Sequence, residues 1–392
     1  MNKYLSKAVS VLSAGAMTLP VIAPLCSGAG FLAAEVSHLT ENGNENHFGT
    51  SDYSLSLPQF VYSNGEGSNE LIMRPKYGSS SSSAAEEFPA SFDMRTDGSL
   101  NGVKDQGPYG TCWTHSSAAS AESSVMAIDP TVDLSEMHTA YFTYAGPMQK
   151  GYDSSLEYYE ILDLGGKASD VVNLWSQWMG PVREEKLPYG DPEIFAKQEI
   201  RDLCNEADYH LRNAYLFDLE KDHSNFEDVS QTIKSFIYNG NAVDASFYVD
   251  EIGYYSYSYN SYYTRLPQRL ANHAITIVGW DDNMPADHFK GTPAGDGAWL
   301  CRNSWGLNYN DQGFFWISYY DKSLTDFAVY ELDDKDNFKK NYHHDTFTPV
   351  QSMSAFDEGD INGKSYCANI FRAENNETIK AVSTYAVNPD SE

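Results

Sequence analysis

The chain has 392 residues, of which 41% are hydrophobic and 14% aromatic, enough for one or two domains with a substantial core. Against 55 aspartate and glutamate residues it carries only 26 lysine and arginine residues, so the formal net charge is -29. Nucleic acids and anionic membrane surfaces repel such a chain, and we exclude both as partners.

The first residues have the layout of a secretory signal peptide. Two lysines precede an apolar run from Ala8 to Leu25, and small residues follow it. Glycine and proline residues interrupt the run, which is also short for a membrane-spanning helix. Lipid attachment at Cys26 is the alternative, but the residues just before this cysteine fit that processing signal poorly. We interpret residues 1–34 as a signal peptide and expect a secreted or cell-surface protein.

Residues 35–87 are polar and end in the serine-rich stretch "GSSSSSAAEE". This composition is typical of a flexible linker or a processing site. The segment also holds a few apolar residues, as in "LSLPQFVYS", which can lie across another surface. We therefore predict a propeptide or linker here, with a partly disordered leader as the alternative.

Ordered structure is expected from "FPASFDMR" onwards, over residues 88–335. Helical spacing of small or apolar residues occurs early, at residues 116–128 and after Asp170. Strand-like segments come later, in "NHAITIVGW", "GAWLCRNSW" and "GFFWISYY". Helices followed by strands favour an α+β protein with two lobes.

The stretch "DQGPYGTCWTHSS" puts Cys112 between a glycine-containing turn and a helix. The N-terminus of a helix carries partial positive charge and stabilises a thiolate, which lowers the pKa of the thiol. Gln106 lies shortly before the cysteine, and its side-chain amide can donate a hydrogen bond to an oxyanion beside the sulfur. These features indicate a reactive cysteine rather than one that only packs.

A histidine and an asparagine on later strands complete the arrangement. In the predicted strand "NHAITIVGW", every second residue from His273 onwards points to the same face. In the later predicted strand "WLCRNSWG", Asn303 likewise shares one face with the residues two and four positions before it. Asn303 can accept a hydrogen bond from one imidazole nitrogen and leave the other toward sulfur, while Trp305 can cover that bond. Each residue alone has an ordinary packing or turn explanation. Their joint occurrence in this order predicts nucleophilic catalysis by cysteine.

These residues resemble the papain-like cysteine peptidase family, with the motifs in the family's order over about residues 88–320. The resemblance implies a two-lobed α+β fold with a helical lobe and a β-barrel-like lobe. It also implies hydrolysis of peptide bonds through a thioester, without a metal or an organic cofactor. The residues that it assigns are Cys112, His273, Asn303 and Gln106 for catalysis, and Gly165, Gly166, Ala274 and Trp305 for binding the substrate.

Two positions depart from the family pattern. Tyr109 stands where the family has a cysteine three residues before the nucleophile, and Leu164 precedes the glycine pair where a second cysteine is usual. The disulfide that joins those positions in the family is therefore absent, which is typical of a bacterial-type member. His115 occupies a position that normally holds a bulky packing residue, so we expect it to pack rather than to catalyse.

The last part of the chain, residues 336–392, resembles the beginning of the lectin-like domain that follows the peptidase domain in clostridial-type cell-surface proteins. "SYCANIFRA" and "TIKAVSTYAV" predict two β-strands of this partial domain. The resemblance implies cell-wall or surface glycan as a partner of this region, besides the protein or peptide substrates of the peptidase. The tyrosine-rich residues 254–263 can contact such polymers, although a partly buried insertion loop explains them better.

The predicted function is that of an exported cysteine endopeptidase, acting as a monomer on cell-surface or extracellular proteins. A non-catalytic adhesin on a peptidase scaffold is one alternative, suggested by the tyrosine-rich stretch and the tail. A cysteine aminopeptidase is another, because exopeptidase action depends on a blocking element that no motif reveals. The acidic loop after Trp280 has carboxylates that can bind calcium, and we interpret it as a surface loop without metal.

Overall fold

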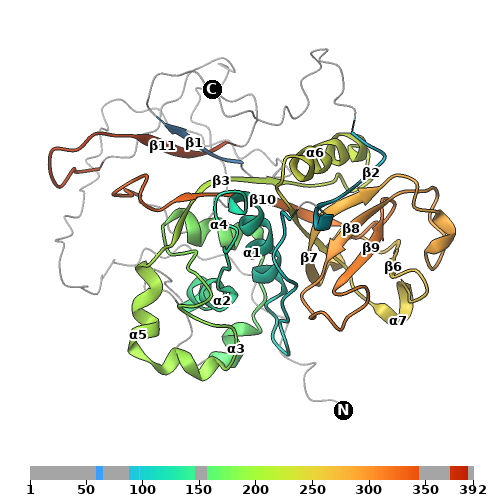
Figure 1. Cartoon of the computed structure of the whole chain (residues 1–392), viewed down its shortest axis with the longest axis horizontal. Helices are drawn as coiled ribbons and strands as arrows, with labels where there is room; N and C mark the ends of the chain where they lie inside the picture. Colours follow the sequence, from blue (N-terminus) through green and yellow to red (C-terminus); the bar gives the residue numbers. More distant parts are fainter. Residues whose placement is uncertain (1–58, 65–87, 97, 146–156, 344–370, 387–392) are drawn as a thin grey trace, which may run out of the picture. The chain divides into compact units, whose positions relative to one another are not determined.

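A computed structural model describes residues 59–64, 88–96, 98–145, 157–343 and 371–386 (Figure 1). The predicted signal peptide at residues 1–34 and most of the predicted propeptide lie outside these ranges. Within them, no helix is long and apolar enough to cross a membrane.

The helices of the first lobe surround one long central helix, α1. The bounds are α1 Cys112–Val125, α2 Glu136–Ala145, α3 Tyr158–Leu162, α4 Ala168–Ser176 and α5 Gln198–Arg201. Nearly every residue of α1 is buried, because its serines and alanines are small enough for neighbouring elements to approach on all sides. It packs against α2 and α4 on one side and against β7 and β10 on the other. In Figure 1, α1 accordingly stands between the helices and the strands.

The strands form one mixed sheet in the order β11-β1-β3-β10-β4-β7-β8-β9-β6-β5, with β2 paired to β7 beside this path. Neighbours are antiparallel except β6 and β9, which are parallel. The bounds are β1 Gln59–Asn64, β2 Ser91–Asp93, β3 Tyr209–Phe217, β4 Val243–Phe247, β5 Tyr255–Ser256, β6 Ser261–Tyr262, β7 His273–Asp281, β8 Ala298–Arg302, β9 Phe314–Ser318, β10 Thr325–Asp334 and β11 Ala381–Ala386. Two further helices, α6 Phe226–Tyr238 and α7 Glu251–Tyr254, belong to this part of the chain.

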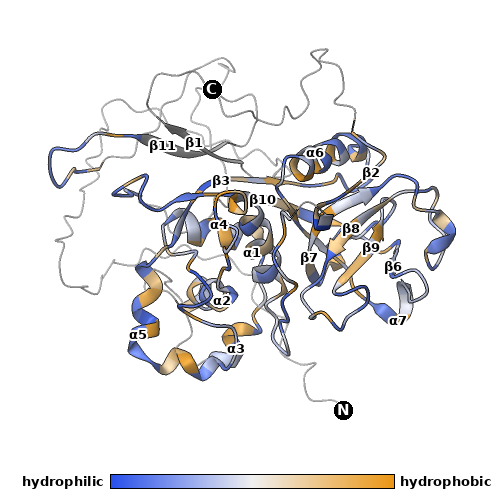
Figure 2. Cartoon of the chain, in the orientation of Figure 1, coloured by the Kyte–Doolittle hydropathy of each residue, from blue (hydrophilic) through white to orange (hydrophobic). Residues whose placement is uncertain are grey.

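Two hydrophobic cores correspond to the two lobes. The core of the helical lobe includes Trp113, Phe142 and Trp175, and that of the strand-rich lobe includes Trp280 and Trp299. Figure 2 shows hydrophobic residues gathered on the strands of the second lobe, while the connecting loops are mostly hydrophilic. The predicted α+β class with two lobes is confirmed. The second lobe differs from the predicted barrel, because the described strands follow an open path that does not close on itself.

Element boundaries differ from the prediction in a few places. The first helix begins at Cys112, as predicted from the turn before it, and ends at Val125 rather than at Ile128. The three strands predicted around the histidine, the asparagine and "GFFWISYY" are present as β7, β8 and β9. In the tail, "TIKAVSTYAV" contains β11, whereas most of "SYCANIFRA" lies outside the described residues. Strand β1, from the predicted propeptide, pairs with β11 along its length and touches β3 at Phe60.

Candidate active site

Cys112 is the first residue of α1, and its side chain is partly buried. Burial raises the pKa of the thiol, while hydrogen bonds from the main-chain N–H groups of Ala274 and Trp113 act in the opposite direction. Ala274 directly follows His273 on β7, so the N-terminus of α1 meets the first residues of that strand. The cysteine and the histidine therefore come from the two lobes and meet where the lobes join.

His273 is buried at the start of β7 and is held by Asn303. Its Nε2 lies 2.8 Å from the Asn303 Oδ1, and because an amide oxygen only accepts, Nε2 carries the hydrogen. The ring of Trp305 stacks on the imidazole with centroids 4.7 Å apart and an angle of 27° between the planes. Burial lowers the pKa of His273 to about 4, against the opposing effect of the Asn303 hydrogen bond. The tautomer with a free Nδ1 is thus the one that this environment favours.

Gln106 is tied to the segment that carries Asn303. Its main-chain N–H donates to the carbonyl oxygen of Ser304 at 2.8 Å, and the Ser304 hydroxyl donates to the Gln106 Oε1 at 2.6 Å. The Gln106 Nε2 donates to the carbonyl oxygen of Tyr109 at 2.7 Å. An amide nitrogen carries two hydrogens, so this bond leaves one for a ligand. The Ser304 main-chain N–H also donates to the Asn303 Oδ1 at 2.8 Å.

The glycine pair lies directly against the residue that follows Cys112. A Cβ on Gly166 would stand 2.4 Å from the Trp113 ring, so only glycine fits at this position. Gly165 has φ +73°, and its carbonyl oxygen accepts a hydrogen bond from the Tyr144 hydroxyl at 2.7 Å. The loop of the glycine pair is therefore fixed beside the N-terminal turn of α1, with the side chain of Trp113 between them.

Tyr189 supports this turn, and the sequence reasoning missed it. Its hydroxyl donates to the carbonyl oxygen of Gln106 at 2.8 Å and lies 2.5 Å from the Thr111 Oγ. Its ring makes edge contacts with Tyr109 and His115. The only signal in the sequence is its place at the end of "VREEKLPY", beside the motifs already noted. Burial raises the pKa of Tyr189 well above its usual range, so its hydroxyl keeps its hydrogen.

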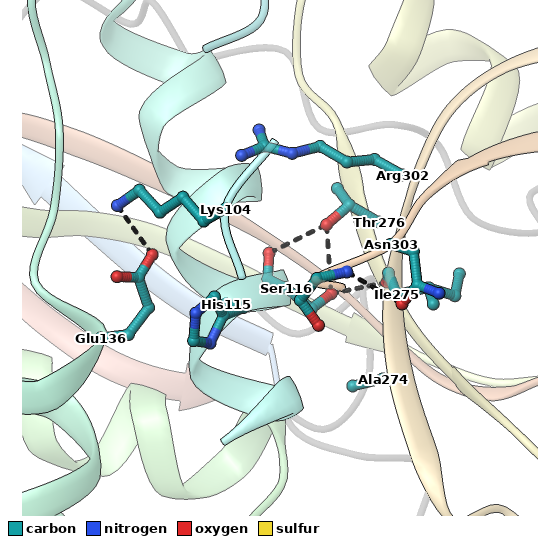
Figure 3. Close-up of a pocket in the computed structure, with 10 residues that line it drawn as sticks. Lys104, His115, Ser116, Glu136, Ala274, Ile275, Thr276, Arg302 and Asn303 are labelled. Carbon is teal, nitrogen blue, oxygen red and sulfur yellow. Dashed lines mark hydrogen bonds and ion pairs between the residues drawn. The ribbon is translucent and has the colours of Figure 1, made fainter. Parts of the chain in front are cut away.

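His115 lines a small polar cavity behind the site (Figure 3). The volume of this cavity is about 10 Å³, which is the room that one water needs. The His115 Nδ1 donates to the Thr111 carbonyl oxygen at 2.9 Å, so the buried Nε2 is a bare acceptor. Burial lowers the pKa of His115 to about 3. On the far side of the cavity Lys104 forms an ion pair with Glu136 at 2.8 Å.

These residues offer the parts of acyl-transfer chemistry. A thiol begins a helix, an imidazole is held in one tautomer by an amide, and a second amide can bind a developing oxyanion. Within the described ranges, no group of three or more His, Cys, Asp or Glu side chains is arranged to hold a metal ion. The thiols of Cys112 and Cys301 take part in no disulfide there.

Known proteins are similar to this chain over most of its described residues. A family model described as papain family cysteine protease matches residues 88–331. A cysteine protease of Blomia tropicalis is 26% identical over 281 residues, which cover 69% of this chain and 71% of the relative. Cathepsin B-like cysteine proteinase 4 of Caenorhabditis elegans is 25% identical over 249 residues, covering 59% and 70%.

Two solved structures of the clostridial cysteine protease Cwp84 are similar as well. The form after propeptide cleavage has a TM-score of 0.54 and 26% identity, covering 66% of this chain and 61% of that one. The structure of the cysteine protease and lectin-like domains of Cwp84, a surface layer associated protein of Clostridium difficile, has a TM-score of 0.52 and 25% identity, covering 64% and 54%. This chain therefore spans little more than half of those chains. Because the family model alone matches more than half of its length, the chain belongs to the papain family of cysteine proteases.

Proposed function

We propose that the protein is an exported cysteine endopeptidase that uses Cys112, His273 and Asn303 to hydrolyse peptide bonds in extracellular or cell-surface proteins. The observation that carries this proposal is the hydrogen bond between the His273 Nε2 and the Asn303 Oδ1 at 2.8 Å. It leaves the Nδ1 of the same ring for the cysteine, under the cover of Trp305. A base held in one tautomer beside a thiol is what nucleophilic catalysis requires.

The reaction begins when His273 takes the proton of Cys112 and the thiolate attacks the carbonyl carbon of the scissile peptide bond. The carbonyl oxygen becomes an oxyanion, which accepts hydrogen bonds from the Gln106 Nε2 and from the main-chain N–H of Cys112. The intermediate collapses to a thioester, and the imidazolium gives its proton to the leaving amine. A water molecule, deprotonated by His273, then hydrolyses the thioester and restores the thiol.

In the absence of substrate, burial disfavours both charged forms of the pair, the Cys112 thiolate and the His273 imidazolium. It raises the pKa of Cys112 and lowers that of His273. The charged pair must therefore be stabilised by its own attraction and by the main-chain N–H groups of α1 and Ala274. We infer that proton transfer depends on close contact between the sulfur and the Nδ1, which the Asn303 bond and the Trp305 stack maintain.

The substrate is an extended peptide. The main chain of Gly165 and Gly166 offers hydrogen-bonding groups beside the turn of α1, and an extended chain can pair with them as an added strand. The main-chain N–H of Ala274 reaches the Cys112 sulfur, and the Trp305 ring stacks on His273. We propose that these four residues hold the substrate on the two sides of the scissile bond.

The location and the remaining segments complete the proposal. The signal-like residues 1–34 and the likeness to surface-associated Cwp84 support export, with residues 35–87 as a propeptide or linker. We assign the peptidase domain to residues 88–335. We propose that residues 336–392 are the start of a lectin-like domain, which would bind surface glycan. We propose a monomer.

A peptide blocked at both ends tests this function. The full chain should cleave it at an internal bond, and Cys112→Ala should lower the rate about a thousandfold or more, since the nucleophile is lost. Cys301→Ala is the matched control, because its thiol is fully buried outside the site, and this variant should retain activity. Cleavage of unblocked peptides alone would indicate an exopeptidase, and full activity of Cys112→Ala would refute the assignment.

A further inference from the structure

A buried carboxyl group lies beneath the N-terminal turn of α1, and the proposed mechanism does not use it. Asp244 on β4 is only 4% exposed. Its Oδ1 lies 2.5 Å from the Ser116 Oγ, and its Oδ2 lies 3.0 Å from the Ser117 Oγ and 3.1 Å from the Tyr330 hydroxyl. Hydroxyl groups from α1 and from β10 thus converge on one carboxyl group.

The contacts of Ser116 require a hydrogen on Asp244. The Ser116 Oγ lies 2.5 Å from the Asp244 Oδ1. It also lies 2.5 Å from the carbonyl oxygen of Ile275, and Figure 3 shows these two residues side by side. A contact of this length between two oxygens needs a hydrogen between them. The serine hydroxyl has only one, and the carbonyl oxygen can only accept. If the serine donates to Ile275, the hydrogen toward Asp244 must come from the carboxyl group itself.

The neighbouring hydroxyl groups do not supply that hydrogen. The Ser117 Oγ lies 2.7 Å from the carbonyl oxygen of Trp113 and donates to it. Tyr330 donates to the other carboxyl oxygen of Asp244. The Thr276 hydroxyl lies 3.3 Å from both the carbonyl oxygen and the Oγ of Ser116, so its hydrogen is directed at Ser116. A neutral carboxylic acid gives each of the two 2.5 Å contacts of Ser116 its own hydrogen, while the longer contact of 3.0 Å between the Ser117 Oγ and the Asp244 Oδ2 has none.

We propose that Asp244 is a positioning residue, held as a neutral carboxylic acid, whose hydrogen ties β4 to the N-terminal turn of α1 and keeps negative charge away from Cys112. This inference rests on the proposed role of Cys112 as nucleophile. In support, burial raises the pKa of Asp244 to about 7, and a charge on Asp244 raises the pKa of Cys112.

The groups around Asp244 explain why its charge matters. The titratable groups that face it are Cys112 on α1 and Tyr330 and Asp326 on β10, and none of them is a cation. From β7 it meets the carbonyl group of Ile275 and the hydroxyl group of Thr276 through Ser116, neither of which titrates. From α4, the Ala168 carbonyl oxygen accepts a hydrogen bond from Tyr330, and the Asp170 carboxyl group, also an acid, acts on Tyr330 as well. A carboxylate at this position would act on the thiolate without compensation from these neighbours.

The test is the rate of Cys112 alkylation by iodoacetamide in wild type and in Asp244→Asn, followed from about pH 5.5 to 8.5. Asparagine keeps the shape and offers an N–H to Ser116, but it cannot ionise. We expect equal rates at the acidic end, where Asp244 is neutral, and at least about threefold faster alkylation of the variant at the alkaline end. A constant ratio above one would mean that Asp244 is charged throughout, which overturns the proposal. A ratio of one throughout overturns it where the infrared band described below is absent, and means that the acid stays neutral up to about pH 8.5 where the band is present.

A spectroscopic measurement tests the protonation directly. The wild type at about pH 5.5 should show a carboxylic-acid infrared band that Asp244→Asn lacks, or Asp244→Ser where the first variant does not fold. Absence of this band contradicts the proposal, whatever the kinetics. Asp321→Asn is the matched control: Asp321 is fully buried with its pKa raised to about 6 by burial, but main-chain N–H groups satisfy it. This control should leave the alkylation ratio unchanged. If Cys112→Ala kept its peptidase activity, the proposed function would fail, yet the band would still establish the acid.

Discussion

Ser304 links the two amide side chains of the candidate site. Its hydroxyl donates to the Gln106 Oε1, and its main-chain N–H donates to the Asn303 Oδ1. The first bond decides which way the glutamine amide faces, because the oxygen is held at the serine and the nitrogen must face the other way. Ser304 therefore orients both Gln106, the proposed oxyanion donor, and Asn303, the partner of the histidine.

Replacing Ser304 by alanine should lower kcat about tenfold and leave KM nearly unchanged. The glutamine amide loses its orientation, and an oxyanion donor matters in the transition state rather than in substrate binding. Steady-state kinetics on a peptide substrate measures this. In a Gln106→Ala background the same change should cost little more, since the donor is already gone. Equal losses in both backgrounds would show that the serine acts through something other than Gln106.

At the scale of single residues, the motifs predicted the candidate catalytic side chains but not the residues that hold them in place. Cys112, His273 and Asn303 were recognised from short motifs whose residue types are required by one mechanism. Ser304 reaches Gln106 across 198 positions of the chain, and the Ser116 bond to Asp244 spans 128. Such pairs leave no pattern in a local window of sequence, because a serine or an aspartate is equally common on the surface. Long-range hydrogen bonds become visible only when the chain is folded.

The resemblance to the family implies that a disulfide usually joins the turn before α1 to the loop of the glycine pair. Here the Gly110 main-chain N–H donates to the Asp163 carboxylate at 2.9 Å, and Trp113 packs under Gly166. A hydrogen bond and a buried ring thus hold the elements that a covalent bond would hold. The aromatic contact of Tyr109 with Tyr189 adds to this packing.

The two glycines of the loop should respond differently to the same substitution. Gly166→Ala places a methyl group inside the Trp113 ring and should cost about 1–3 kcal/mol of unfolding free energy by overpacking. Gly165→Ala meets nothing within 4 Å and should cost about 1 kcal/mol through its positive φ alone. Urea denaturation measures both costs. Because Trp113 follows Cys112, only Gly166→Ala should also slow alkylation of the thiol, and equal slowing in both variants would contradict this account.

Burial alone did not decide which strands could be predicted, because β7 and β8 are as fully buried as β3. The strand-like motifs around His273 and Asn303 became β7 and β8. The start of α1 at Cys112 was predicted from the glycine-containing turn before it, although a run of small residues carries no apolar periodicity where every side is covered. The strand β3 was missed because its sequence, YHLRNAYLF, has no β-branched residue, whereas that of β7, HAITIVGWD, has four.

At the scale of the molecule, β3 and β10 join the two lobes. Their alternate residues enter different cores, with Ala214 and Tyr330 in the helical core and Phe217 and Phe327 in the strand-rich core. Since successive side chains of a strand point to opposite faces, one pair of strands forms a wall of both lobes. We infer that the lobes share their stability, and that a buried group in either lobe affects unfolding of the whole.

Buried histidines should make this shared stability sensitive to acid. His115, His138 and His273 have pKa values lowered to about 3, 4 and 4, chiefly by burial. A histidine in the unfolded chain has the ordinary value of 6.5 and binds a proton first as the pH falls. Each neutral histidine therefore makes its full contribution to the free energy of unfolding above pH 6.5. That contribution is lost as the pH falls toward the pKa of the histidine in the folded protein. The unfolding free energy should therefore decline between these limits.

His115→Phe isolates one such contribution. Phenylalanine keeps the edge contact with Tyr189 and removes the unpaired Nε2, and the Thr111 carbonyl oxygen keeps its hydrogen bonds from the main-chain N–H groups of residues 114 and 115. Near neutral pH the variant should be as stable as the wild type or slightly more stable. Between about pH 7 and 4 the wild type should lose about 3 kcal/mol more than the variant, which is the free energy of protonating one histidine only in the unfolded chain. Urea denaturation at both pH values measures this difference. Equal losses of unfolding free energy in the two proteins would mean that His115 is protonated in the folded protein too. A water in the adjoining cavity would then accept a hydrogen bond from the charged ring.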